Sequence, residues 1–171
     1  MKGFCVLKKN SLHEQFMKKA LAQAKIAFRH NEVPVGAVII DENGVVLSRA
    51  YNKVEKFGCQ TAHAEVLAIQ KACKKRGDWR LDNCWMYVTL EPCLMCFGLI
   101  QLSRMKGVAF GVKSSLFGFG YGSNKTLPLY NKDLIITDGI LEYRCHFMLK
   151  DFFKNLREKR RVGGEKKKTI F

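Results

Sequence analysis

Two short motifs place a histidine, a glutamate and two cysteines at spacings that suit metal chemistry. The first is His63-Ala64-Glu65 and the second is Pro92-Cys93-Leu94-Met95-Cys96. Imidazole nitrogen and thiolate sulfur are ligands that zinc prefers, and three of them leave one tetrahedral position open for water. Zinc lowers the pKa of such a water to about 7. The carboxylate of Glu65, two residues after the histidine, is therefore expected to carry the proton without binding the metal.

The first motif is expected at the start of a helix. Thr61 can cap a helix that begins near Ala62, because a threonine hydroxyl accepts a hydrogen bond from a first-turn backbone N–H. His63 and Glu65 are two residues apart and would not share a face in the middle of a helix. They can serve one pocket only if the end of their helix points into it.

The second motif is expected at the start of another helix, because Pro92 suits a first helical turn. The positive end of a helix lowers the pKa of a thiol, and Cys93 and Cys96 lie on one helix face. A Cys-x-x-Cys pair is also found in redox pairs and in structural zinc sites. In that alternative Cys59, four residues before His63, would be a fourth ligand and would close the site.

Length and composition fit one intracellular domain that binds a polyanion. The 171 residues suffice for one core, and the seven cysteines are odd in number and irregularly spaced. We find no signal peptide in residues 1–9 and no apolar run of about 18 residues, so we expect a cytoplasmic protein without a membrane partner. The net charge of +15 favours nucleic acid as partner over a basic surface that serves only solubility.

Hydrophobic periodicity predicts alternating helices and strands without a linker or repeat. The order α-β-β-α-β-α-β-β-α predicts an α/β fold with three layers, α/β/α, around a mixed five-stranded sheet. The expected helices are residues 11–30, 62–75, 93–102 and 139–161, and the expected strands are 35–40, 45–51, 85–90, 107–111 and 134–137.

The end of the chain is basic, with ten Lys or Arg against four Asp or Glu in residues 142–171. On a helix Phe152 would lie in the apolar stripe and Phe153 at its edge. Phe153 with Lys154 and Arg157 could therefore stack on a base and contact phosphates. A solvated basic helix with two packed phenylalanines is an equal alternative. In the aromatic and glycine-rich loop 117–122, packing against a neighbouring subunit is favoured over a role at a pocket rim.

Four segments closely resemble the bacterial tRNA-specific adenosine deaminases. They are Glu32–Ala37, Asn52, Thr61–Glu65 and Val88–Cys96, and the likeness extends from about residue 12 to 161. The combination of H-x-E with P-C-x-x-C is far more specific than either half. The resemblance implies a cytidine-deaminase-like fold, a homodimer and one Zn²⁺ per subunit. It also implies hydrolysis of the wobble adenosine to inosine in the anticodon stem-loop of a tRNA, with an arginine tRNA expected.

The resemblance also implies roles for individual residues. His63, Cys93 and Cys96 would hold the zinc, and Glu65 would be the proton shuttle. Residues 1–161 would form the zinc-dependent deaminase domain, followed by a basic, disordered tail of residues 162–171.

Three further residues would contact the substrate. Asn52 would hydrogen-bond the flipped nucleotide, although asparagine is also favoured in turns. Val33 and Ala64 would help line the base pocket, although both residue types also serve as plain packing residues.

The loop after the fourth strand departs from the family. Ser114 stands where an acidic residue is usual, and Phe117 and Phe119 stand where small residues are usual. Serine can still contact a ribose hydroxyl. The residues expected to contact RNA are Lys113, Ser114, Phe153, Lys154 and Arg157.

Two other functions are consistent with the motifs. The first is a free-base or nucleoside deaminase of the same superfamily, acting on guanine, cytosine or cytidine, which has little need for a charge of +15. The second is a non-catalytic RNA-binding protein with a closed structural zinc, which would release no ammonia.

Overall fold

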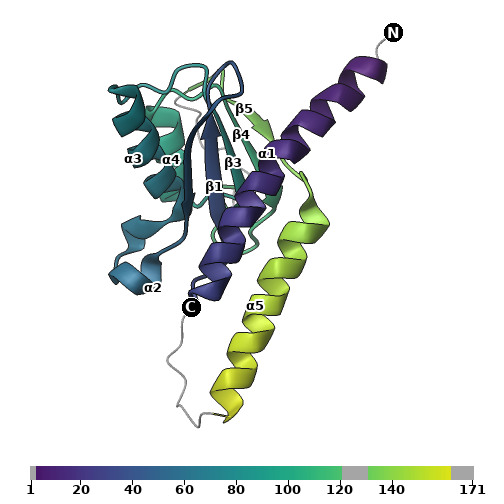
Figure 1. Ribbon diagram of the computed structural model, residues 1–171, viewed down its shortest axis with the longest axis vertical. Helices are drawn as coiled ribbons and strands as arrows, with labels where there is room; N and C mark the ends of the chain where they lie inside the picture. The colour runs from purple at the N-terminus through teal and green to yellow at the C-terminus, as the bar shows by residue number, and fades with distance from the viewer. Residues whose placement is uncertain (1–2, 121–130, 163–171) are drawn as a thin grey trace.

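A mixed five-stranded sheet forms the centre of the molecule (Figure 1). The computed structural model describes residues 3–120 and 131–162. The strand order is β2-β1-β3-β4-β5, with β1 antiparallel to both of its neighbours and β3, β4 and β5 parallel. The strands are β1 (Gly36–Ile40), β2 (Val46–Tyr51), β3 (Trp85–Leu90), β4 (Gly107–Val112) and β5 (Ile135–Thr137).

Helices cover both faces of the sheet, as the predicted α/β/α layers require. One face carries α1 (Gly3–Arg29) and α5 (Glu142–Val162), and the other carries α3 (Ala64–Arg76) and α4 (Leu94–Leu102). A short α2 (Val54–Phe57) and a 3-10 turn, η1 (Gln60–Ala62), connect β2 to α3. No helix in the described part of the chain is long and apolar enough to cross a membrane.

The inner strand β1 shows why the sheet needs both helix layers. All five of its residues are buried. Val38 and Ile40 pack with the α1 side, whereas Ala37 and Ile39 pack with the α3 side. A strand that is apolar on both faces must be covered on both, because each exposed apolar face would cost hydrophobic free energy.

The helices differ from the sequence prediction at the starts of α1 and α5, in the presence of α2, and at the start of α3, which is described with the site. Helix α1 begins at Gly3 and not at Ser11, because serine inside a helix costs only a few tenths of a kcal/mol. Helix α5 begins at Glu142, since Gly139 has a left-handed φ of 75° that no helix continues through. The four-residue α2 was not predicted, because it is too short to show helical periodicity.

The two phenylalanines of α5 lie as the helical pattern predicts, and the helix includes Val162, which was predicted to begin the tail. Phe152 is buried against Phe28 of α1, and Phe153 is 40% exposed. The predicted tail beyond residue 162 lies outside the described residues.

Gly36 sets the distance between β1 and α1, because a Cβ there would clash with the backbone of Ala20 and Ala24. We expect Gly36→Ala to lower the free energy of unfolding by about 1–3 kcal/mol, a typical cost of overpacking. Gly98 in α4 has open space around it. Gly98→Ala should be neutral or stabilising by up to about 1 kcal/mol. Urea unfolding measures both, and equal stability of the two variants would contradict the close contact.

Candidate active site

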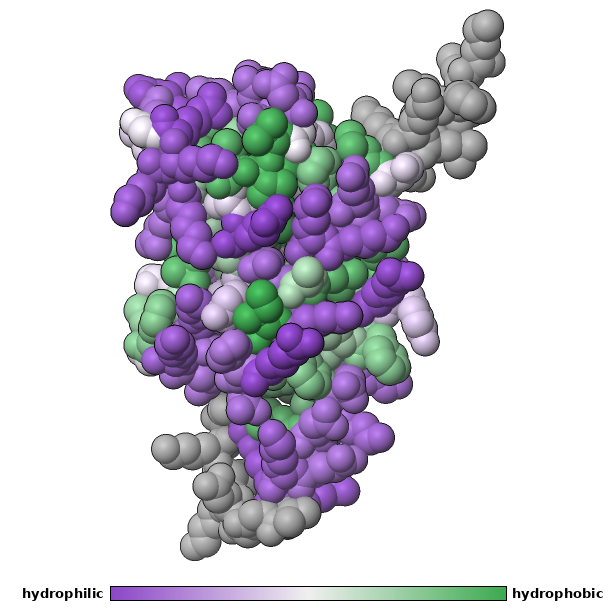
Figure 2. Space-filling view, in the orientation of Figure 1, coloured by the Kyte–Doolittle hydropathy of each residue, from purple (hydrophilic) through white to green (hydrophobic). Residues whose placement is uncertain are grey.

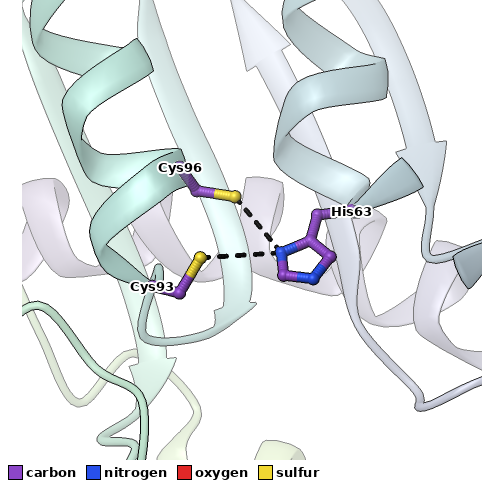
Figure 3. Close-up of side chains that lie close together, drawn as sticks. All are labelled: His63, Cys93 and Cys96. Carbon is purple, nitrogen blue, oxygen red and sulfur yellow. Dashed lines mark hydrogen bonds between the residues drawn. The ribbon is translucent and has the colours of Figure 1, made fainter. Parts of the chain in front are cut away.

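The side chains of His63, Cys93 and Cys96 converge between the N-termini of α3 and α4 (Figure 3). The His63 Nδ1 atom lies 3.6 Å from the Cys93 Sγ and 3.4 Å from the Cys96 Sγ. All three ligand atoms lie within 4.8 Å of one another. In residues 3–120 and 131–162, this is the one group of three or more His, Cys, Asp or Glu side chains that could hold a metal ion.

These distances fit a tetrahedral zinc site. Zinc binds histidine nitrogen at about 2.05 Å and thiolate sulfur at about 2.3 Å, which places the two ligand atoms about 3.6 Å apart at a tetrahedral angle. The observed separations of 3.4 and 3.6 Å agree with that value. Three protein ligands leave the fourth position for a water molecule or a substrate.

Two of the ligands occupy helix N-cap positions. His63 caps α3 and Cys93 caps α4, both with extended backbone and neither with a side-chain capping hydrogen bond. Their carbonyl oxygens accept the first helical bonds, from the N–H groups of Leu67 and Phe97. Two helix N-termini therefore converge on the cluster, and their positive ends favour thiolate ligands.

The predicted Thr61 cap is wrong. The chain from Gln60 to Ala62 forms the 3-10 turn η1, and the helix begins only at Ala64. The Thr61 hydroxyl instead lies 3.0 Å from the Cys59 Sγ. The side chain at the cap position is thereby left free to bind metal.

The two thiols differ in acidity. A hydrogen bond from Cys96, assisted by His63, lowers the pKa of Cys93 to about 4, so a thiolate is available at neutral pH. The same hydrogen bond, together with burial, raises the pKa of the Cys96 thiol. The second proton is expected to leave only when a cation such as zinc binds, because a coordinated thiol is deprotonated.

Glu65 lies in the first turn of α3 and is only 4% exposed. Burial raises the pKa of its carboxyl group, although the nearby His63 opposes this. The carboxyl group interacts with Cys96 but is not part of the ligand group. A buried carboxylate with a raised pKa, next to the metal ligands and not bound to the metal, can accept and return a proton near neutral pH.

Cys59 does not close the site. Its side chain is exposed and does not belong to the metal-binding group. The described residues therefore do not form a structural zinc site with four protein ligands.

The zinc-binding region that defines the cytidine and deoxycytidylate deaminases matches residues 10–112, which include both motifs. The chain belongs to this deaminase family. It is 42% identical over 156 residues to a tRNA-specific adenosine deaminase of Bacillus subtilis (strain 168), covering 88% of this chain and 94% of the relative. The family's cofactor is zinc, in agreement with the ligand geometry.

Solved structures of related deaminases share the fold. One, from studies of A-to-I editing by tRNA:A34 deaminases, is 33% identical with a TM-score of 0.74 and covers 79% of this chain and 99% of its own. A guanine deaminase from Bacillus subtilis is 40% identical with a TM-score of 0.56, but covers only 59% of this chain and 64% of its own. The cytidine-deaminase-like fold is confirmed.

Two of the three residues expected to hold substrate are connected to the ligand His63: Ala64 follows it in the chain, and Asn52 is connected to it through its neighbour Lys53. The Asn52 N–H donates to the Val35 carbonyl, and the next N–H, of Lys53, donates to the carbonyl of Ala62, beside His63. Ala64 is fully buried and Val33 is half-buried against the core. Asn52 is only 6% exposed and its side chain donates to Glu32, so it does more than form a turn.

The loop after β4 is fastened to the cysteine motif. Glu91 accepts hydrogen bonds from the backbone N–H groups of Ser114 (2.8 Å) and Gly120 (3.1 Å). Gly118 pairs with Cys93, and a Cβ at Gly118 would clash with the Glu91 carboxylate. The loop therefore forms a wall beside the cluster.

The aromatic residues of this loop behave differently from one another. The Phe119 ring stacks on Phe97 of α4 at 3.8 Å, so at that position the packing is within the subunit and not, as predicted, against a neighbouring one. Phe117 is 54% exposed. Residues 121 and 122 of the loop lie outside the described residues.

The residues expected to contact RNA form two groups. The exposed Lys113 pairs with Asp138 at 2.9 Å, and Ser114 accepts a hydrogen bond from the Phe117 N–H, so both already have partners. Phe153, Lys154 and Arg157 are exposed on α5.

Sequence reasoning gave no role to Glu32 and Glu91, although both belong to the segments that resemble the family. Each carboxylate is buried and accepts backbone N–H groups from residues more than 20 positions away. The available signal was an acid shortly before a proline in two of the family-like segments, Glu32 two residues before Pro34 and Glu91 next to Pro92. A carboxylate that becomes buried there needs hydrogen-bond partners.

The cluster predicts which cysteines matter for metal binding. We expect Cys59→Ser to retain one zinc per chain, since its side chain does not reach the cluster. The matched change Cys96→Ser removes a ligand and should lose most of the metal at limiting free zinc. Elemental analysis of dialysed protein measures both, and loss of zinc from the Cys59 variant would show that the site is closed.

Proposed function

We propose that this deaminase hydrolyses adenosine to inosine at the wobble position of a tRNA anticodon. The observation that carries the proposal is the 42% identity to a tRNA-specific adenosine deaminase over 94% of that relative, together with the open metal cluster. The charge of +15 supports an RNA substrate, because phosphate contacts depend on Lys and Arg.

The chemistry is a hydrolysis in which water replaces the 6-amino group as ammonia. Zinc, held by His63, Cys93 and Cys96, would supply the Lewis acid that activates water. Glu65 accepts a proton from that water and donates to the ring nitrogen N1. Glu65 then takes the second proton of the attacking water, from the hydroxyl now bound to C6, and passes it to the leaving amine. The C6 oxygen becomes a carbonyl, ammonia leaves, and Glu65 is unchanged overall. Its burial favours this role, because a raised pKa brings the carboxyl group closer to neutral pH.

The base pocket lies beside these groups. The half-buried Val33 offers apolar surface to an adenine and Asn52 offers a hydrogen bond, whereas the fully buried Ala64 can only support the pocket from behind. A nucleotide in an anticodon loop is unpaired, so little base pairing must be broken to place it there. The loop that Glu91 holds through Ser114 and Gly120 would bound this proposed pocket on the cysteine side.

We further propose that α5 contacts the RNA outside the pocket. Figure 2 shows a hydrophilic surface over the C-terminal half of α5. There the exposed Phe153 can stack on a base while Lys154 and Arg157 contact phosphates. Lys159 donates to Asn31 next to Glu32, which ties this part of α5 to the pocket side of α1. Lys113 and Ser114 would add contacts from the loop.

A homodimer in the cytoplasm completes the proposal. The solvent face of α4 exposes Leu94 (58%), Met95 (41%) and Leu102 (54%). Apolar side chains gathered on one helix face favour burial against a second subunit. A tRNA substrate and free thiols fit the cytoplasm, and we propose an arginine tRNA as the substrate on the family resemblance alone. Residues 1–161 would form the deaminase domain.

A guanine deaminase is the second candidate, because a solved enzyme of that activity is 40% identical over part of this chain. The tRNA adenosine deaminase and the guanine deaminase differ in the size and charge of the substrate that they must bind. A guanine deaminase needs neither an RNA loop nor a strongly basic surface.

Comparing substrates tests the proposal. We expect inosine from an anticodon stem-loop of an arginine tRNA, with kcat/KM at least about 100-fold above that for free adenosine, guanine or cytidine, since remote RNA contacts raise kcat/KM. Mass analysis of nucleosides and ammonia release measure this. Faster release of ammonia from free guanine than from the hairpin would support the second candidate instead.

Glu65→Gln tests the proton transfer. The variant keeps the shape of the side chain and should keep its zinc, because Glu65 is not a ligand. We expect kcat on the hairpin to fall by about 10²–10⁴-fold, the usual contribution of a general acid and base. Single-turnover kinetics on zinc-loaded protein measures this, and an undiminished rate would mean that another group moves the proton.

A further inference from the structure

The carboxylate of Glu32 is the hub of a buried hydrogen-bond network. It is 1% exposed. Its Oε1 accepts from the Lys56 N–H at 2.8 Å, and its Oε2 accepts from the Glu55 N–H at 3.1 Å and from the Asn52 Nδ2 at 3.2 Å. Backbone N–H groups can only donate, so both oxygens of Glu32 are fixed as acceptors.

This network determines which end of the Asn52 amide faces Glu32. An amide can present either its carbonyl oxygen or its nitrogen, and the partner decides which. Because Glu32 only accepts, Asn52 must present Nδ2 to it. The Oδ1 atom is therefore turned away from Glu32, and within the described residues it accepts no hydrogen bond from the protein.

The Oδ1 atom of Asn52 is nevertheless not sealed in the protein. Among the described residues, the buried side-chain oxygen or nitrogen without a partner is Ser48 Oγ, not Asn52 Oδ1. The backbone of Asn52 is tied to Val35, and its neighbour Lys53 is tied to Ala62, directly before the ligand His63. An acceptor that remains available lies beside the proposed substrate pocket.

We propose that Glu32 is a positioning residue that fixes the Asn52 amide so that its Oδ1 accepts a hydrogen bond from the substrate nucleoside. This inference rests on the proposed function. It adds the direction of one hydrogen bond, in which the protein accepts and the substrate donates. The site offers an acceptor and selects a substrate donor, either a ribose hydroxyl or an amino group of the base. A substrate that presents only an acceptor there would leave two acceptors facing each other, which is costly in a buried site.

A purely structural role is the competing explanation, since Glu32 also anchors the start of α2 through Glu55 and Lys56. The two explanations differ in what a compensating change at Asn52 does. If Glu32 only anchors α2, a change at Asn52 should not restore the activity that a change at Glu32 removes. If Glu32 orients the Asn52 amide, a compensating change at Asn52 should restore that activity.

The experiment is a double-mutant cycle of Glu32→Gln and Asn52→Asp in the zinc-loaded protein, assayed on the anticodon hairpin. In Glu32→Gln, the new amide can donate toward Asn52, which then turns its oxygen inward and presents Nδ2 to the substrate. In Asn52→Asp, two carboxylates face each other in a buried site and repel. In the double variant, the introduced glutamine amide donates to the introduced aspartate, whose second carboxylate oxygen is again an acceptor for the substrate.

We expect each single change to lower kcat/KM by about tenfold or more, from one misplaced hydrogen bond. The double variant should recover to within about threefold of wild type, so Asn52→Asp would be harmful alone and beneficial beside Glu32→Gln. The Glu55 N–H loses its acceptor in Glu32→Gln and in the double variant alike. The cost of that lost hydrogen bond therefore cancels when the two proteins are compared. Zinc content and melting temperature should match between these two proteins.

A double variant no better than Glu32→Gln would overturn the proposal. If the proteins substituted at Glu32 and Asn52 do not fold, NMR of the zinc-loaded Glu65→Gln protein decides: binding of the adenosine-containing hairpin should shift the Asn52 side-chain carbonyl carbon, and an unmoved resonance overturns the proposal. A 2′-deoxyadenosine at the target position separates the two donors, because only a hydroxyl contact is lost with it. If wild type deaminates only free guanine, the proposed function fails, and the same cycle on guanine still tests the role of Glu32.

Discussion

The convergence of two helix N-termini on one point is the constraint on which the rest of the structure depends. His63 and Cys93 stand at N-cap positions, where a capping side chain usually accepts a backbone hydrogen bond. Neither forms such a bond, and omitting one typically costs about 1 kcal/mol per helix. Metal binding can offset this cost, because binding free energy to a site that exists only in the fold is also folding free energy. The sheet makes the convergence possible, since β3 leads directly into the cysteine motif and β1 ties β3 to β2.

Three buried glutamates surround this point and perform different tasks because their partners differ. Glu65 lies among the metal ligands, and burial raises its pKa, which suits proton transfer. Glu32 and Glu91 instead accept hydrogen bonds from backbone N–H groups, which fix the chain around the site. One residue type thus serves as proton carrier in one place and as anchor in two others. The environment of each carboxylate, and not its identity, decides its role.

Much of this arrangement could be predicted from the sequence, because its signals are local. The apolar periodicity predicted the order of helices and strands. The two motifs predicted that His63, Cys93 and Cys96 form one cluster, because residues at the start of a helix can reach only a limited region. The Thr61 cap was wrong because a 3-10 turn and a helix differ by one residue in their hydrogen bonds, which residue preference does not resolve. The roles of Glu32 and Glu91 were not predicted, because a carboxylate that reaches backbone N–H groups more than 20 residues away leaves no periodic pattern. Asn52 shows the same limit, since the orientation of its amide depends on Glu32.

The central claim is a zinc ion held by one imidazole and two thiolates with its fourth position open, and X-ray absorption at the zinc edge tests it most directly. The account predicts two sulfur neighbours at about 2.3 Å and two nitrogen or oxygen neighbours at about 2.0–2.1 Å, one of them exchangeable water. A spectrum with three sulfur neighbours would place Cys59 on the metal. It would contradict an open site, and with it a hydrolytic role for this cluster.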